Sequence, residues 1–194
     1  MSKALSFALG VLFFVGCEIT IDKPIGKEFS AKEKSSLVGS WVSDEGSFWE
    51  VQKNKKADLV IGALSWDDKK NEFKVETIEL FLTTIGQSEY AFFKSEGNFV
   101  FCRYVRKDDS NLELMIPDSK AFRKLVQESV AAAKVSGSKA IGVVEDENPD
   151  FSVNSDFAIK LSSESKALLE FFESPKIDAC FDNKPFLKLK RIHK

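Results

Sequence analysis

Residues 37–51 read LVGSWVSDEGSFWEV, and an apolar period of two residues begins in this stretch. Every second residue from Leu37 to Trp41 falls on one face, which is the period of a strand with one buried side. The turn-forming residues 44–47 come next, and a second apolar run follows at residues 48–51. The stretch therefore predicts a β-hairpin.

Further apolar runs of strand length follow, separated by polar or glycine-bearing turns. They cover residues 59–66, 73–82, 89–94, 98–106 and 112–116. This spacing predicts a meander of about seven short strands. A last run at 186–191 alternates Leu187 and Leu189 with lysines, so we expect a closing strand with one face in the core.

Helical periodicity interrupts the strands at about residues 118–136. Apolar residues recur there at spacings of three and four between Phe122 and Ala133, after a helix-start signal and before Gly137. A second candidate helix begins near Ser162 and ends at Pro175, and residues 157–161 alternate like a further strand. The fold class is therefore mainly β with one or two packed helices, and α+β is the alternative.

The segment Gly39-Ser40-Trp41 at the head of the first strand resembles the Gly-x-Trp signature of the lipocalins. The resemblance implies an antiparallel lipocalin-like barrel or half-barrel in which the tryptophan closes the floor. The family also packs a basic residue near its last strand over the indole ring. Arg191 alternates onto the same face as Leu187 and Leu189, so Gly39, Trp41 and Arg191 form the expected floor motif, with a cation–π contact.

The first seventeen residues have the organisation of an export signal. Lys3 precedes an apolar run at residues 4–15, which is too short to span a bilayer permanently, and Gly16-Cys17 follows. This resembles the bacterial lipobox, in which the cysteine is acylated and becomes the first residue. A plain secretory signal and an uncleaved anchor are the alternatives.

The lipobox resemblance implies an envelope lipoprotein that faces the periplasm, with residues 1–16 as signal peptide and Cys17 lipidated. Glu18 stands where an aspartate would favour the inner membrane, so the outer membrane is expected. Residues 17–36 are polar, with a proline and a glycine, and predict a flexible tether after the lipidated cysteine. Residues 37–194 are then long enough for a single domain.

Composition argues against several function classes. The formal net charge is −2 and no basic tract stands out, so nucleic acid is not an expected partner. The sole histidine, His193, lies next to the end of the chain, and there is no Gly-x-Ser-x-Gly motif. We therefore expect no catalytic residues, no metal site and no cofactor, and the protein is not predicted to be an enzyme.

Two cysteines remain if Cys17 carries lipid, namely Cys102 and Cys180. A pair of cysteines in an oxidising compartment could form a disulfide. Two buried free thiols would look the same in the sequence, so both alternatives stay open.

The 18 phenylalanines suggest an aromatic interior that either is solid or holds an apolar ligand. In the first hypothesis the protein binds a small apolar ligand or an envelope partner, and the pocket wall includes Trp41, Phe73, Phe81 and Phe99. In the second hypothesis the barrel is solid, and the protein is a structural or inhibitor-like interaction module. An exposed apolar strip on residues 122–133 would favour the second hypothesis.

Overall fold

The computed structural model describes residues 19–44, 46–55, 58–67, 70–95, 97–136, 140–146, 157–164, 166–181 and 184–193. The strands are β1 (Ile19–Ile21), β2 (Lys27–Glu28), β3 (Gly39–Ser43), β4 (Phe48–Lys53), β5 (Leu59–Asp67), β6 (Glu72–Ile85), β7 (Ser88–Ser95), β8 (Asn98–Arg106), β9 (Asn111–Met115), β10 (Gly142–Asp146), β11 (Phe157–Leu161) and β12 (Leu187–His193). The helices are α2 (Ala31–Leu37), α3 (Ser119–Ser136), α4 (Lys166–Glu173) and the 3-10 helix η1 (Pro175–Cys180).

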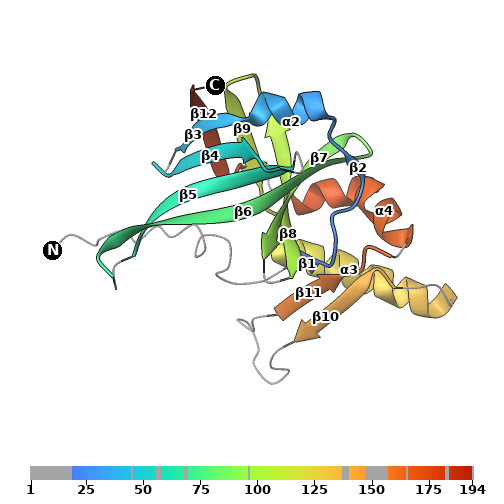
Figure 1. Ribbon diagram of the computed structural model, residues 1–194. Coiled ribbons are helices and arrows are strands. Elements are labelled where there is room, and N and C mark those ends of the chain that lie inside the picture. Colours follow the sequence, from blue (N-terminus) through green and yellow to red (C-terminus); the bar gives the residue numbers. More distant parts are fainter. Residues whose placement is uncertain are drawn as a thin grey trace.

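Within the described ranges, eight antiparallel strands close into a barrel (Figure 1). Each strand from β3 to β9 pairs with the next one in the chain. β12 then pairs with both β9 and β3 and completes the wall. This up-and-down order confirms the predicted mainly β barrel with packed helices, and because the wall is closed, the half-barrel alternative is wrong.

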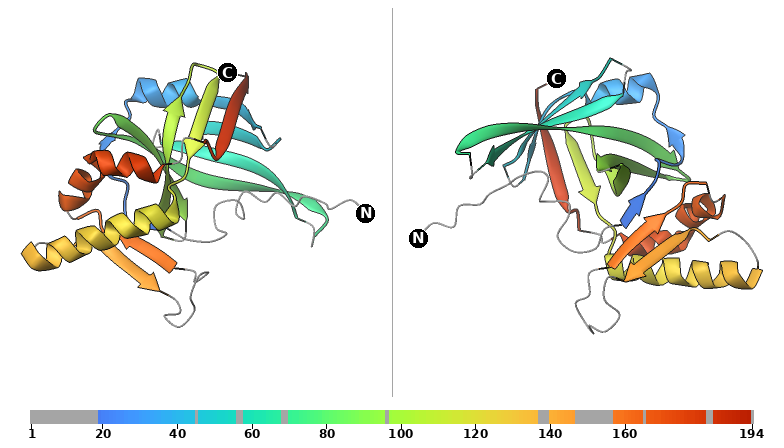
Figure 2. Two further views of the ribbon diagram at one scale, coloured as in Figure 1. Left: turned by 180° about the vertical axis from the view of Figure 1, so that it is seen from behind. Right: turned by 60° about the horizontal axis from the view of Figure 1, so that its bottom comes forward.

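The elements between β9 and β12 form an insertion beside the barrel. α3, β10 and β11 lie together at the end of the molecule remote from α2, as both views of Figure 2 show. β11 pairs with β10 and, in parallel, with β1, and β1 pairs with the first residues of β8. The barrel wall therefore continues at β8 into a small additional sheet.

The inserted helices match the sequence-based expectation closely. α3 spans Ser119–Ser136, against a prediction of about residues 118–136. α4 ends at Glu173, before Pro175, and η1 begins at that proline. The strand predicted at residues 157–161 is β11, whereas β10 was not predicted.

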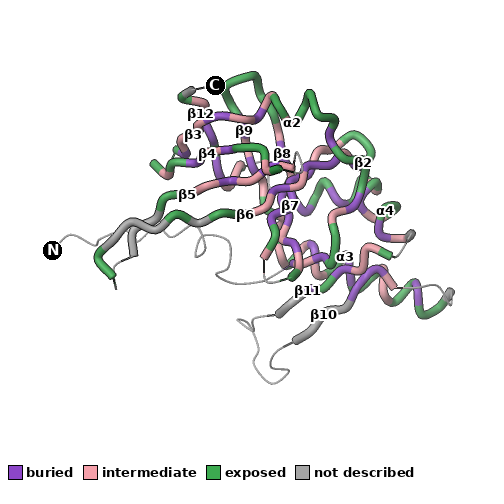
Figure 3. Tube along the Cα trace, viewed as in Figure 1, coloured by how far each residue is buried: buried purple, intermediate pink, exposed green. Residues whose placement is uncertain are grey.

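Two hydrophobic cores lie on opposite faces of the wall made by β6, β7 and β8. The inner core fills the barrel, and the outer core lies between this wall and the insertion; Figure 3 shows buried positions in both regions. Consecutive residues of β7 alternate between the cores: Ala91 and Phe93 point inward, and Tyr90 and Phe92 point outward. Because both faces of β7 are covered, all four residues are buried.

The predicted tether at residues 17–36 is wrong for every described residue of that range. Ile19, Ile21, Ile25 and Phe29 are buried, and β1, β2 and α2 occupy the segment. The physical reason is that these four apolar side chains, separated by polar residues, reach the two cores and bury their surface there. Cys17 and the predicted signal peptide lie outside the described residues.

Candidate functional site

The barrel interior is the first candidate site, and it is filled by side chains. Its buried residues come from every barrel strand and include Trp41, Trp49, Val51, Leu59, Ile61, Leu80, Leu82, Ala91, Phe93, Cys102, Tyr104, Leu112, Leu114, Leu187 and Leu189. The cavity left among them measures about 30 Å³. One water molecule occupies roughly 30 Å³ in the liquid, and pockets for small ligands measure roughly 300–1,000 Å³. The part of the interior that these described side chains line therefore has no room for an apolar ligand.

Two of the predicted wall residues do not line the barrel. Phe81 and Phe99 belong to the outer core, where their rings meet edge to face with centroids 5.4 Å apart. On β6 the inward positions belong to Leu80 and Leu82, so strand alternation sends Phe81 outward. Only the backbone of Phe73 is described, so its predicted role falls outside the described side chains.

The predicted floor motif assembles at the end of the barrel that carries α2. The indole of Trp41 is 1% exposed, and its Nε1–H donates a hydrogen bond of 2.9 Å to the carbonyl oxygen of Leu37. The guanidinium carbon of Arg191 lies 4.3 Å from the centroid of the Trp41 ring, which confirms the predicted cation–π contact. Gly39, with φ of 132°, starts the strand in a conformation that favours glycine.

Arg191 also joins β12 to the C-terminal turn of α2. Its guanidinium donates hydrogen bonds to the carbonyl oxygens of Ser36 and Val38, the latter at 3.3 Å. These carbonyls belong to a helix end that lacks partners within the helix. Burial, together with the charge of Arg106, lowers the pKa of Arg191. Residues from α2, β3 and β12 are thereby held together at the point where the barrel closes.

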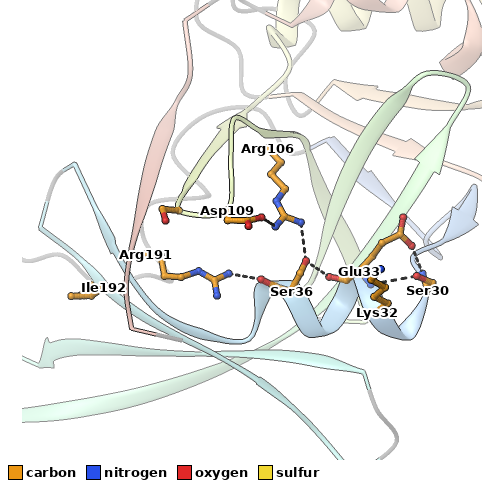
Figure 4. Close-up of a pocket in the computed structure, with 9 residues that line it drawn as sticks. Ser30, Lys32, Glu33, Ser36, Arg106, Asp109, Arg191 and Ile192 are labelled. Atoms are coloured by element: carbon orange, nitrogen blue, oxygen red, sulfur yellow. Dashed lines mark hydrogen bonds and ion pairs between the residues drawn. The ribbon is translucent and has the colours of Figure 1, made fainter.

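An open polar cleft of about 840 Å³, here called the upper cleft, lies above this motif. It is lined by Ser30, Lys32, Glu33, Ser36, Arg106, Asp109, Ser110, Arg191 and Ile192 (Figure 4). Arg106 is engaged on two sides: it forms an ion pair with Asp109 and donates a hydrogen bond of 2.8 Å to Ser36 Oγ. Arg106 thus fastens α2 to the end of β8 and the loop that follows it.

A second half-buried arginine, which the sequence reasoning missed, ties the insertion to the barrel. Arg103 on β8 lies 4.4 Å over the ring of Phe181 and pairs with Asp178 of η1 at 2.5 Å. It also donates a hydrogen bond of 3.4 Å to the hydroxyl of Tyr90. A lone arginine inside an apolar strand was the available signal, because such a charge needs a partner when it is buried.

An apolar groove of about 380 Å³, here called the outer groove, crosses the outside of β4, β5 and β6. It is lined by Phe48, Glu50, Gln52, Val60, Gly62, Leu64, Val75 and Thr77. Three of its large apolar side chains are exposed: Phe48 is 43%, Leu64 49% and Val75 67% exposed. By contrast, the strip predicted on α3 is not open to solvent at Phe122, Val126 and Ala133, which are buried.

The two cysteines lie in different cores and are both free. Cys102 belongs to the inner core and Cys180 to the outer core, so the barrel wall separates them. The disulfide alternative is therefore wrong. Burial raises the pKa of both thiols, that of Cys180 to about 11, and the carboxylate of Asp118 adds to the effect at Cys180.

Two further features, a cluster of metal ligands and a membrane-spanning helix, are not found among the described residues. No group of three or more histidine, cysteine, aspartate or glutamate side chains in the described ranges could hold a metal ion. His193 is described only by its backbone, which pairs with Ser40. None of the described helices is long and apolar enough to cross a membrane.

Comparison with known proteins adds no assignment: no family model, no curated protein and no solved structure matches this chain.

Proposed function

We propose that this protein is a lipid-anchored, non-enzymatic protein of the cell envelope, facing the periplasm, whose solid barrel serves as a scaffold for contact with another envelope protein. The filled interior carries this proposal, because a residual cavity of about 30 Å³ is roughly one tenth of the smallest usual ligand pocket. Carriage of a small apolar ligand inside the barrel is therefore the weaker alternative.

The anchor rests on the sequence of the export signal. An apolar run ends at Gly16 and Cys17, the arrangement in which the lipobox cysteine is acylated. Glu18, which stands in place of an aspartate, favours the outer membrane as the destination.

The contact surface in this proposal is the outer groove together with the adjacent free edge of β5. In the described part of the chain, β4 pairs with β5 only as far as Ala63, so residues 64–67 of β5 have a described strand partner, β6, on one side alone. Unpaired peptide groups at such an edge can accept an added strand. We assign this surface to an extended apolar segment of an envelope protein, which would continue the line of β4 and place side chains beside Leu64 and Val75.

Native mass spectrometry of the full chain, purified from membranes, tests the solid scaffold. The expected mass is that of the protein with its covalent lipid at Cys17. A further mass that organic extraction releases would show a carried ligand and overturn the scaffold assignment. The Cys17→Ser variant should lose the lipid mass and leave the detergent phase on partition, and continued partition into detergent would overturn the anchor.

A photo-crosslinking residue placed at Leu64 tests the contact surface in the native envelope. Leu169 on α4 is the matched control, because it is similarly exposed at 40% and lies away from the groove. Crosslinks to one envelope protein from position 64, absent from position 169 and lost on Val75→Lys, are expected. Equal crosslinking from both positions, or none from either, would contradict the assignment.

A further inference from the structure

We propose that the anchor holds the domain directly against the bilayer in one orientation, with the end of the β1–β11–β10 sheet at the lipid surface and the α2 end facing away. This inference rests on the proposed lipidation of Cys17. It concerns a contact surface for lipid headgroups, which is distinct from the outer groove.

The first step is that β1 is fixed on both edges. Ile19 pairs with Ile159 of β11, and Thr20 pairs with Val100 of β8. The side chains of Ile19 and Ile21 are 7% and 1% exposed in the outer core. A strand held by two neighbours and by its buried face cannot detach without loss of that burial.

The chain after β1 is fixed as well. The carboxylate of Asp22 accepts a hydrogen bond of 2.7 Å from the Ser163 amide, and the Phe29 amide donates to the Leu82 carbonyl at 3.0 Å. At Gly26, where φ is 94°, an added Cβ would lie 2.7 Å from the Thr84 carbonyl oxygen. The segment is thus held against β6 and against the chain that follows β11, and it cannot act as a spacer.

The second step is the short reach between lipid and domain. Cys17 stands two residues before Ile19, and two residues span at most about 7 Å when fully extended. A flexible tether over residues 17–36 would instead have had an end-to-end distance of roughly 25 Å. The lipidated cysteine must lie at the headgroups, so the start of β1 lies against them too.

The third step is direction. β1 runs parallel to β11 and β11 runs antiparallel to β10, so the chain before Ile19 leaves the sheet where β11 begins and β10 ends. Figures 1 and 2 place this end of the molecule opposite α2. The upper cleft and the Trp41–Arg191 motif then face away from the lipid.

Fluorescence quenching in vesicles tests the orientation. The full lipidated chain, with its lipid mass verified, carries one fluorophore through Lys160→Cys on β11 or through Lys32→Cys on α2. Both positions are exposed, and Lys160 pairs with Thr20 at the proposed lipid end. In phosphatidylcholine vesicles with nitroxide-labelled headgroups, we expect loss of fluorescence at position 160 and none at position 32. Equal quenching would overturn the orientation.

A spacer variant tests whether the short link is the cause. Ten glycine and serine residues inserted between Glu18 and Ile19 add a mean reach of roughly 17 Å, so the difference between the two positions should disappear. A difference that persists would show that the link does not orient the domain. Absence of lipid at Cys17 would instead overturn the anchor itself, whereas a lipidated chain with equal quenching would overturn only the orientation.

Discussion

At the scale of single residues, Trp41 and Arg191 together close one end of the barrel, and they do so by stacking on each other. The indole fills the interior at 1% exposure, while the guanidinium covers its outer face and binds the last carbonyls of α2. The positive charge of Arg191 is stabilised by the face of the indole ring and by the C-terminus of the helix, where positive charge is favoured. Arg191 thus joins three elements: β3, which is the first barrel strand, β12, which is the last one, and helix α2, which precedes β3.

Replacement of Trp41 by alanine should lower the free energy of unfolding by about 3–5 kcal/mol, because a large buried ring leaves a cavity. Phe48→Ala is the matched control: Phe48 is 43% exposed, and a change within about 0.5 kcal/mol is expected. Urea unfolding followed by circular dichroism measures both. Equal, small losses would mean that the indole does not stabilise the barrel.

Arg191→Lys and Arg191→Met should both destabilise the protein, the methionine variant more strongly. Lysine keeps the charge over the ring but cannot donate from a planar fork to two carbonyls at once. A loss of roughly 1–3 kcal/mol is expected for methionine, since the carbonyls of Ser36 and Val38 lose their donor. Unfolding midpoints in urea would show the order, and a methionine variant as stable as the parent would contradict it.

The thiols of Cys102 and Cys180 should both be intact and unreactive in the folded protein. Burial raises their pKa values, and for Cys180 a pKa of about 11 leaves a thiolate fraction on the order of one in a thousand at pH 8. Alkylation of folded Cys180 should therefore rise about tenfold per pH unit below pH 11, and both thiols should react fully in denaturant. A mass lower by two hydrogens would instead show a disulfide.

At the scale of elements, the sequence predicted the barrel strands well because each has a local signal. Alternation within β3 and β12, and turn residues between neighbouring strands, depend on residues close in the chain. The N-terminal segment has no such signal. Its partners are distant in the chain, as in the hydrogen bond from Thr20 Oγ1 to the Ile159 carbonyl across 139 residues. Without these partners in view, the mostly polar sequence of the segment has the pattern of a tether.

Alternation also indicates which residues share a face without telling which face lies inside the barrel. The prediction that Phe81 and Phe99 line the barrel interior is therefore wrong. The unbroken apolar run from Tyr90 to Phe93 held the missing information, because a strand covered on both faces loses its polar positions. Such a run predicts a second core outside the barrel, but it does not indicate which elements cover the outer face of the strand.

The importance of β1 can be tested with Ile21→Ala. The side chain is 1% exposed in the outer core, so a loss of about 2–5 kcal/mol is expected in urea unfolding. Lys23→Ala, two residues along and exposed, should change the stability by less than about 0.5 kcal/mol. Equal and small losses of stability in the two variants would mean that residues 19–21 behave as a tether after all.

The capping box of α2 makes a prediction about acid stability. Ser30 Oγ accepts from the Glu33 amide, and the Ser30 amide donates to the Glu33 carboxylate at 2.6 Å, so hydrogen bonds from Ser30 lower the pKa of Glu33. Ser30→Ala should cost about 1 kcal/mol at neutral pH. Because the pKa of Glu33 is lower in the folded state, its carboxylate stabilises the fold at a pH above the unfolded pKa. This stabilisation is lost as the pH falls through the pKa of the folded state.

Urea unfolding of Ser30→Ala and its parent between pH 7 and pH 3 measures this dependence. The stability gap between the two proteins should narrow toward pH 3. A gap that widens as the pH falls would contradict the proposed role of the carboxylate.

At the scale of the whole molecule, one shared wall supports two cores. β7 and β8 bury Ala91, Phe93 and Cys102 inward while Phe92 and Phe101 pack outward against the insertion. Arg103 pairs with Asp178 across this junction. Because the wall is packed from both sides, the barrel has little freedom to widen around a ligand. The stiffness of this doubly packed wall therefore supports the scaffold assignment, in addition to the small volume of the internal cavity.

The solid interior can be tested by opening it. Leu82 is 1% exposed and borders the residual cavity, so Leu82→Ala should create an apolar space that a benzene-sized probe can enter. Added benzene should then raise the melting temperature of this variant and leave the parent unchanged, because a ligand stabilises only a protein that binds it. Leu169→Ala, at an exposed position, removes the same atoms without an internal cavity and should behave like the parent. A parent protein that benzene or a fatty acid stabilises would show that the barrel opens to ligands, and the apolar-carrier alternative would then replace the scaffold.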